Sequence, residues 1–226
     1  MTLSIVAREP QARLFGVAIA SSSPAVAARC AHARAGIGAV ATQNITDPAL
    51  GPAILAHLAA GAAAGAALEE SLRATPFGAY RQLLVIGKDG PPAVHSGARA
   101  LGLASFAIGA DAAAAGNLLA HPDVPAAMVA AFQSASSRFG ERLLHALHAG
   151  ALRGGEAGPI HSAGLLIVRD LSWPLIDLRI DWSSRDPIAE LAQLWDLYAP
   201  QMEDYVLRAI DPERAPNFGV PGDRTR

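Results

Sequence analysis

The segment at residues 14–21 constrains the fold more than any other part of this chain. Its side chains alternate between two sizes, with large apolar residues at Phe15, Val17 and Ile19 and small ones at Gly16, Ala18 and Ala20. In an extended strand these two sets face opposite sides. A strand face with so little side-chain volume needs another layer packed closely against it, either helices or a second sheet.

Two neighbouring segments, residues 3–8 and 37–44, are also short apolar runs and read as strands. Glycines at positions 36 and 38 leave one end of the second run without side chains. Because the connections are short and the small faces match, we expect the strands that start at Thr2, Leu14 and Ile37 to be neighbours in one sheet.

Composition indicates one well-packed domain. The chain has 226 residues, of which 51 % are apolar and 50 are alanine, so backbones approach closely and Leu, Ile and Val provide the volume. This composition excludes global disorder. We expect a single domain over residues 1–210, followed by a Pro- and Gly-rich segment, residues 211–226, that is either a loose tail or an arm docked on the surface.

Charge and cysteine content exclude several classes of partner. The net charge is −2 and no basic run exists, which argues against a nucleic-acid partner. The single cysteine, Cys30, allows neither an intrachain disulfide nor a cysteine-based metal cluster. The longest uncharged stretch, residues 48–68, is interrupted by prolines and glycines and is a poor membrane span. Charges in the first apolar run do not fit a secretory signal, so we expect a cytoplasmic protein.

The remaining pattern alternates groups of helices and strands. The final helix is predicted to start at Asp186-Pro187, and Pro200 is expected to kink it or split it. The order suggests an α+β fold of antiparallel sheets with helices outside. The other predicted helices start at residue 48 and cover 66–73, 125–138 and 140–149; the other predicted strands cover 81–87, 93–96, 103–108, 162–168 and 174–182.

Common catalytic signatures are missing: the sequence has no G-x-S-x-G, H-E-x-x-H, Walker loop or G-x-G-x-x-G after a strand. His145 and His148, one turn after Glu141, could face a metal, but an exposed polar stripe explains them equally well. We therefore expect no metal and no cofactor.

Thr2 is the candidate nucleophile. A threonine directly after Met1 is small enough to permit removal of the methionine, which would make Thr2 the first residue. Its hydroxyl could then attack a carbonyl while its own α-amine, with a pKa of about 7.7–8.0, takes the proton. Thr2 also begins a predicted strand that is followed by a turn and a second strand.

The whole chain resembles the domain of unknown function 1028 family, within the N-terminal nucleophile (Ntn) hydrolase-like superfamily. The segments that carry the resemblance are residues 1–8 (MTLSIVAR), 16–21 (GVAIAS), 33–43 (ARAGIGAVATQ), 116–119 (GNLL), 162–166 (SAGLL), 177–181 (DLRID), 186–187 (DP) and 215–223 (APNFGVPGD). The resemblance implies a four-layer αββα sandwich of two antiparallel sheets flanked by helices. It also implies hydrolysis of an amide by an N-terminal Thr, Ser or Cys.

Some positions depart from the pattern of that superfamily. Arg34 lies where proteasome-like members carry a lysine, and an arginine keeps the charge but does not shuttle protons. Ala18 and Ala20 stand where those members place an acidic residue on the second strand. The family also tends to have Gln at the position of His161 and Asn at that of Asp47. These departures argue against proteasome-like proteolysis.

We expect the site to form around Thr2 and to act on a small molecule. The resemblance suggests that Arg34 lowers the pKa of the Thr2 amine or binds an anionic substrate, and that Asn117 holds the oxyanion. Other residues would line the pocket, namely Gln43, Ser162 and His161. Arg34, Gln43, Asn117 and Ser162 should converge on Thr2, since each begins or ends a predicted strand.

Three alternatives stay open at this point. The chain is a small-molecule amidohydrolase, a non-catalytic binding or assembly protein that keeps the sandwich, or a hydrolase centred on Ser162 with His161. The alanine-rich helix faces make a homodimer plausible.

Overall fold

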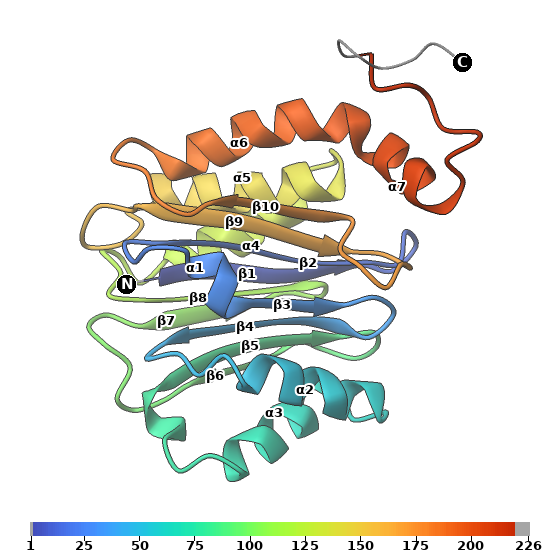
Figure 1. Ribbon diagram of the computed structural model, residues 1–226. Coiled ribbons are helices and arrows are strands. Elements are labelled where there is room, and N and C mark those ends of the chain that lie inside the picture. The colour runs from blue at the N-terminus through green and yellow to red at the C-terminus, as the bar shows by residue number, and fades with distance from the viewer. Residues whose placement is uncertain (1, 220–226) are drawn as a thin grey trace.

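The computed structural model describes residues 2–219 and contains two antiparallel sheets (Figure 1). The six-stranded sheet has the order β10-β9-β2-β1-β8-β7 and the four-stranded sheet the order β3-β4-β5-β6. The strands are β1 (Thr2–Glu9), β2 (Leu14–Ser21), β3 (Ala31–Arg34), β4 (Gly38–Asn44), β5 (Arg81–Gly87), β6 (Ala93–Ser96), β7 (Ser105–Ile108), β8 (Ala112–Asn117), β9 (Ser162–Val168) and β10 (Ile176–Ile180).

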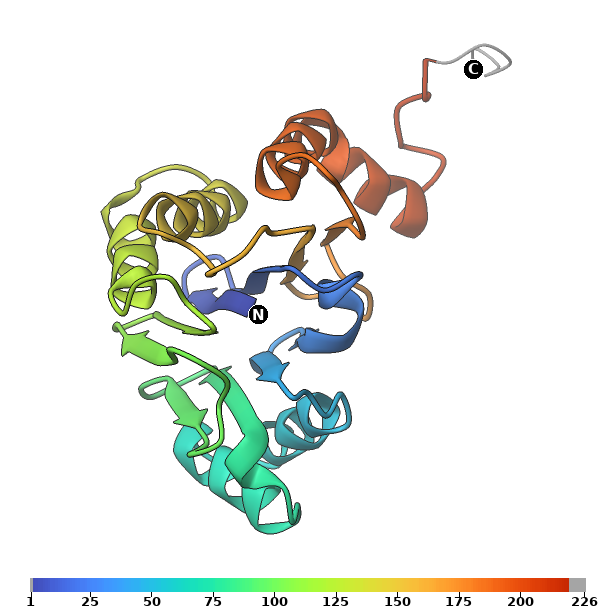
Figure 2. The ribbon, with the colours of Figure 1, turned by 90° about the vertical axis from the view of Figure 1, so that its left-hand side faces the viewer.

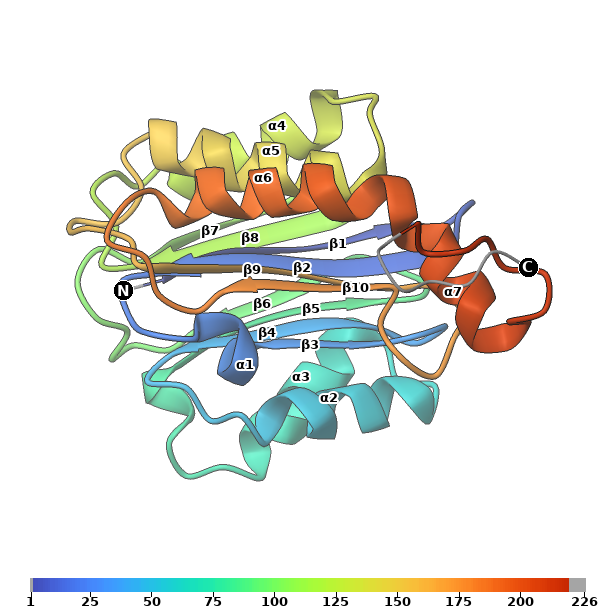
Figure 3. The ribbon, with the colours of Figure 1, turned by 45° about the horizontal axis from the view of Figure 1, so that its top comes forward.

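Helices cover the outer face of each sheet, which makes the fold a four-layer αββα sandwich, as expected (Figures 1 and 3). Helices α4 (Val124–Ser134), α5 (Phe139–Leu152) and α6 (Pro187–Tyr198) lie on the six-stranded sheet, and α2 (Leu50–Ala59) and α3 (Ala64–Arg73) lie on the four-stranded one. The short α1 (Val26–Cys30) joins β2 to β3.

The small face of β2 is covered by α5, as its alternation predicts. Ala18 and Ala20 are buried in the core beneath the helices, and a Cβ added to Gly16 would lie only 2.7 Å from Leu143 Cδ1. The large face points the other way, where Phe15 and Val17 fill the space between the two sheets. The missing volume on one side of the strand is therefore the space that the helix occupies.

The predicted sheet order is wrong for the third strand. β1 and β2 pair with each other, but the strand over residues 37–44 belongs to the opposite sheet. After β2 the chain turns at Ala25, whose φ is 49°, and crosses to the second sheet through α1. Ala39 and Ala41 then pack across the sandwich against the first sheet. The small side chains of Ala39 and Ala41 therefore allow the two sheets to approach closely, and they do not indicate that this strand lies beside β1 or β2.

Pro200 splits the last helix, as expected. α6 ends at Tyr198, a 3₁₀ turn covers Ala199–Gln201, and α7 (Met202–Ile210) follows. Beyond it, Arg208 donates hydrogen bonds to the carbonyls of Pro216 and Asn217, so the described part of the C-terminal segment lies along α7. Residues 220–226 and Met1 lie outside the described part of the chain. Within residues 2–219, none of the helices combines the length and the apolar character that a bilayer span requires.

Candidate active site at the amino end of β1

The alternation of β1 places Thr2 between the two sheets. Val6 packs in the inter-sheet core and Ser4 bonds a residue of the opposite sheet, so Thr2 faces the same way. On one side of Thr2 lies its pairing partner Asn117, at the end of β8, and on the other side lies Ser21, at the end of β2. All four of these polar residues are buried. They form one end of a core that is otherwise apolar, the end that faces the viewer in Figure 2.

The opposite sheet contributes Gln43 and Gln82 to the same end. Both are almost fully buried: Gln43 follows the inward-facing apolar residues of β4, and Gln82 precedes those of β5. Ser4 Oγ donates to Gln43 Oε1 at 2.6 Å, and Gln43 Nε2 donates to Gln82 Oε1 at 2.7 Å. A layer of hydrogen bonds thus replaces apolar contact between the sheets at this end.

The hydrogen bonds fix the orientation of each amide. Gln43 Nε2 also donates to the carbonyl of Ala115 at 3.2 Å, and Gln82 Nε2 to that of Gly116 at 3.0 Å. A carbonyl only accepts, so both amide nitrogens are identified. Because Gln82 Oε1 can only accept, the Asn117 atom that lies 3.2 Å from it is the donor Nδ2.

This leaves Asn117 Oδ1 buried and without a hydrogen-bond partner. Oδ1 is an acceptor, whereas an oxyanion needs a donor. Asn117 Nδ2 gives one of its two hydrogens to Gln82 Oε1, so the predicted role of Asn117 in holding an oxyanion depends on the second hydrogen and stays a prediction.

A chain of hydroxyl groups connects Thr2 to a cation. Thr2 Oγ1 lies 3.3 Å from Ser21 Oγ, which lies 3.0 Å from Ser23 Oγ. Arg29 Nη2 donates to Ser23 Oγ at 3.2 Å, and the backbone N–H of Ser23 donates to Ser21 Oγ at 3.1 Å. If the Ser23 hydroxyl in turn donates to Ser21 Oγ, the single hydroxyl proton of Ser21 points to Thr2 Oγ1. The positive charge of Arg29 is then transmitted to the Thr2 oxygen through two hydroxyls.

Arg34, in contrast, lies at the other end of the sandwich, so the expectation that it converges on Thr2 is wrong. It is exposed and pairs with Gly38, which in turn pairs with Gly87. Arg8 reaches the Gly87 carbonyl from β1 at 2.9 Å, six residues along the strand from Thr2. At about 3.3 Å per residue this separation is about 20 Å. Spacing along the sequence could not reveal that the chain crosses between sheets before residue 34.

Ser162 and His161 lie near Thr2 but do not form a catalytic pair. Ser162, the first residue of β9, pairs with Ser21 of β2. Its hydroxyl donates to the Ser23 carbonyl at 2.6 Å and accepts from the N–H of Val26. His161 stacks on Trp182, with ring centroids 4.3 Å apart, and its Nδ1 lies 2.8 Å from the Ser183 carbonyl. The Ser162 hydroxyl therefore holds the turn that carries Ser23, while the histidine is turned toward the surface.

Sequence reasoning missed Glu156. It pairs with Leu119 after β8, and its Oε2 accepts from the N–H of Ser22, which follows β2. Because β1 lies between β2 and β8, Glu156 crosses over the end of β1 where Thr2 begins. It is 6 % exposed, Oε1 has no hydrogen-bond partner, and burial raises the pKa of this carboxyl to about 7. Its only sequence signal was a lone acid within a glycine-rich loop.

Backbone strain collects at this same end. Among residues 2–219, four non-glycine residues have a positive φ, and three of them, Ala25, Asn44 and Leu118, flank the site. Asn44 and Leu118 are tied together because Leu101 donates its N–H to Asn44 Oδ1 and accepts from the N–H of Leu118. Non-glycine residues held at a positive φ cost free energy, and such residues concentrate at functional sites.

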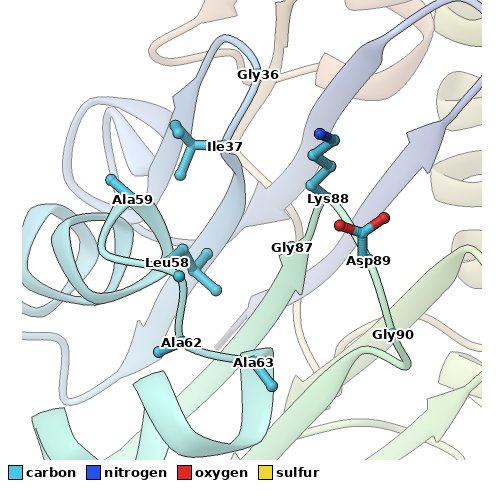
Figure 4. A pocket seen from close by; sticks show the side chains of 11 residues that line it. Gly36, Ile37, Leu58, Ala59, Ala62, Ala63, Gly87, Lys88, Asp89 and Gly90 are labelled. Carbon is cyan, nitrogen blue, oxygen red and sulfur yellow. The ribbon is translucent and has the colours of Figure 1, made fainter.

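A separate pocket of about 490 Å³ opens at the far end of the sandwich (Figure 4). Its lining is mainly glycine and alanine, with Leu58 and Ile37 on one wall and the exposed Lys88 and Asp89 at its rim. No buried polar group lines it among the described residues. Nor do residues 2–219 bring three His, Cys, Asp or Glu side chains close enough to hold a metal ion.

A family model described as a family of unknown function, DUF1028, matches residues 2–191. The chain belongs to the DUF1028 family. The match includes Thr2, Ser21, Gln43, Asn117 and Ser162, and it ends within α6. No curated protein matches the chain significantly.

Two solved structures are similar to this DUF1028 chain. Protein SPO2555 from Silicibacter pomeroyi is 29 % identical, with a TM-score of 0.81 over 88 % of this chain and 89 % of that one. The second is BPH from Thiobacillus denitrificans, solved in complex with epoxomicin. It is 14 % identical, with a TM-score of 0.38 over 75 % of this chain and 98 % of that one.

Proposed function

We propose that this DUF1028 protein is a small-molecule amidohydrolase that uses Thr2 as an N-terminal nucleophile after removal of Met1. One observation carries the proposal: the Thr2 hydroxyl is buried at the end of a core and joined through Ser21 and Ser23 to the guanidinium of Arg29. A threonine that only completes a strand has no need of a polarised chain of hydroxyls.

The reaction follows from the chemistry of a free Thr2. Its α-amine accepts the hydroxyl proton while Oγ1 attacks the amide carbon, which forms an ester with Thr2. The carbon–nitrogen bond breaks, and the amine leaves with the proton that the α-amine had taken. Water then attacks the ester, which releases the acid and restores the Thr2 hydroxyl.

Arg29 takes the part that the resemblance would give to Arg34. A cation coupled through hydrogen bonds to Thr2 Oγ1 stabilises negative charge as it develops on that oxygen. The burial of Thr2 and Ser21 strengthens this effect at the nucleophile, because solvent screening is weak between the sheets, whereas Ser23 and Arg29 are half-buried.

One observation favours a second candidate, a non-catalytic binding protein with the same fold. Gln43 and Gln82 use both of their amide hydrogens within the protein, so of these three buried amides only one hydrogen of Asn117 Nδ2 is left for an oxyanion. A protein that only binds its ligand would not need an oxyanion site with several donors.

Reaction with an electrophile separates the two candidates. Protein whose intact mass shows that Met1 is absent should form a covalent ester with an activated acyl ester, and peptide mapping should locate it at Thr2. Thr2→Ser should keep part of this reactivity and Thr2→Ala should lose it. Equal labelling of protein that retains Met1 would contradict the N-terminal mechanism, since its Thr2 nitrogen is an amide and not a base.

A further inference from the structure

The unsatisfied polar atoms nearest Thr2 are acceptors. Three of the buried side-chain atoms without a hydrogen-bond partner belong to this end of the sandwich: the acceptors Glu156 Oε1 and Asn117 Oδ1, and the donor Arg81 Nε. Arg81 directly precedes the inward-facing Gln82 on β5, so its side chain leaves the strand on the opposite face, away from Thr2. A buried acceptor without a partner costs free energy, and this cost is recovered when a donor arrives. The site is thus prepared for a ligand that donates.

A pocket of about 300 Å³ gives access to Glu156. It opens between the loop that carries Glu156 and the start of α6, and three charged residues line it: Glu156, Arg185 and Asp186. This volume is at the lower end of the range for small-molecule sites.

Two of these three charges are already used within the protein. Arg185 Nη2 forms an ion pair with Glu190 Oε1 at 2.7 Å. Asp186 Oδ1 caps α6 by accepting from the N–H groups of Ile188 and Ala189. Glu156 forms no salt bridge with a described side chain, and the positive charge that lowers its pKa against the effect of burial is that of the chain's amino group, so no side chain of this pocket neutralises its carboxyl.

We propose that the Thr2 site selects amides that also carry a primary ammonium group, and that Glu156 binds this ammonium through Oε1. The inference rests on the proposed function, because it assigns the substrate class of the same site. It reverses the expectation of an anionic substrate: the arginine expected to bind one lies at the other end of the molecule, and the uncommitted charged group near Thr2 is a carboxyl.

The position of Glu156 relates the ammonium to the nucleophile. Glu156 spans the end of β1 between Leu119 and Ser22, and Thr2 is the first described residue of that strand. Recognition of both groups therefore requires a short substrate whose ammonium lies beside the loop while its amide reaches over the end of β1 to the Thr2 hydroxyl. Another possible partner of Glu156 is the α-amine of Thr2 itself after removal of Met1, and the test has to distinguish the two.

Binding of matched amides tests the proposal without requiring catalysis. β-Alaninamide carries an ammonium group, and butanamide is its uncharged counterpart. The full-length protein should bind β-alaninamide about tenfold more tightly than butanamide in calorimetric titrations at pH 8, where the Glu156 carboxyl is ionised. Glu156→Gln should remove this preference. Glu141→Gln, the same change in the first turn of α5, at the opposite end of that helix from the Glu156 loop, should keep it.

The possible outcomes separate the two proposals. Equal affinity for charged and uncharged amides, or a preference that survives in Glu156→Gln, would overturn ammonium recognition. If Glu156→Gln slows acylation of Thr2 by the neutral ester p-nitrophenyl butanoate and no ammonium preference exists, the carboxyl serves the Thr2 amine and the proposal fails. If the unmodified protein without Met1 hydrolyses no amide but shows the ammonium preference, the hydrolase is rejected and the recognition site is supported.

Discussion

At the end of the sandwich where β1 begins, polar side chains lie buried between the sheets, whereas at the end where β1 stops, charged side chains lie on exposed turns. Thr2, Gln43 and Asn117 belong to the first end. Arg34 and Lys88 belong to the second, where Arg8 also forms an ion pair with Asp111 at 2.7 Å. Both ends have a nearby pocket.

The difference between the ends shows that a pocket alone does not identify a site. The pocket beside Lys88 is lined mainly by glycine and apolar residues, and its charged residues are exposed. The Thr2 end retains unpaired acceptors, a carboxyl with a raised pKa and residues with positive φ. Each of these costs stability, and a fold keeps such costs where a ligand or a reaction compensates for them.

The largest expected effect of a mutation is on the buried amide layer. Gln82→Leu keeps the volume but removes the group that accepts from Gln43 and Asn117 and donates to Gly116. Several buried groups lose partners, so the free energy of unfolding should fall by about 3 kcal/mol. Urea denaturation measures this change. The control Gln201→Leu, at an exposed position, should change it by less than about 0.5 kcal/mol; equal losses would show that the layer is dispensable.

A comparison of two arginines tests which end is coupled to Thr2. Arg29→Gln should slow acylation of Thr2 by about 10- to 100-fold, because the hydroxyl chain loses its cation. Arg34→Gln should leave the rate unchanged, since Arg34 lies about 20 Å away. The measurement is the pH profile of labelling by an activated ester. Ser23→Ala should act like Arg29→Gln, and the double variant should add little to either; the opposite ranking of the two arginines would restore the role that the resemblance gives to Arg34.

The raised pKa of Glu156 predicts a dependence of stability on pH. This pKa is about 7 in the folded protein, against an ordinary value of 4.5, so the folded state holds the proton more tightly than the unfolded state. Stability that this proton provides is present below about pH 4.5 and is lost as the pH rises to about 7. Glu156→Gln should therefore be more stable than the unmodified protein by about 2 kcal/mol at pH 8, and equal to it near pH 4. Thermal denaturation across this range checks the difference, and parallel curves would contradict it.

The smallest effect is expected at the far pocket. Lys88→Ala removes the only lysine of the chain, yet Lys88 is exposed and lies on a turn. Its loss should change the free energy of unfolding by less than about 0.5 kcal/mol and leave Thr2 acylation unchanged. A loss of activity in this variant would transfer the functional assignment to the pocket in Figure 4.

Local patterns of the sequence determined much of the fold. The alternation over residues 14–21 predicted a strand with one face pressed by another layer, and the positions of Pro187 and Pro200 marked the start and the break of the last helix. These features depend on neighbouring residues alone, because side-chain direction alternates along a strand and proline acts on its own turn. For the same reason Thr2 could be identified as a candidate from its position at the start of a strand.

Tertiary structure decided the rest. Residues 112–115 are four alanines, whose intrinsic preference is helical, yet they form β8 because their small side chains let both the helices and the second sheet approach. The chain crosses between the sheets after β2, which separates Arg34 from Thr2 and brings Arg29 toward it through Ser23. Glu156 lies over the start of β1 only because a loop far away in the sequence bridges Leu119 and Ser22 there. Such contacts depend on the path of the chain in space, which the spacing of residues along the sequence does not specify.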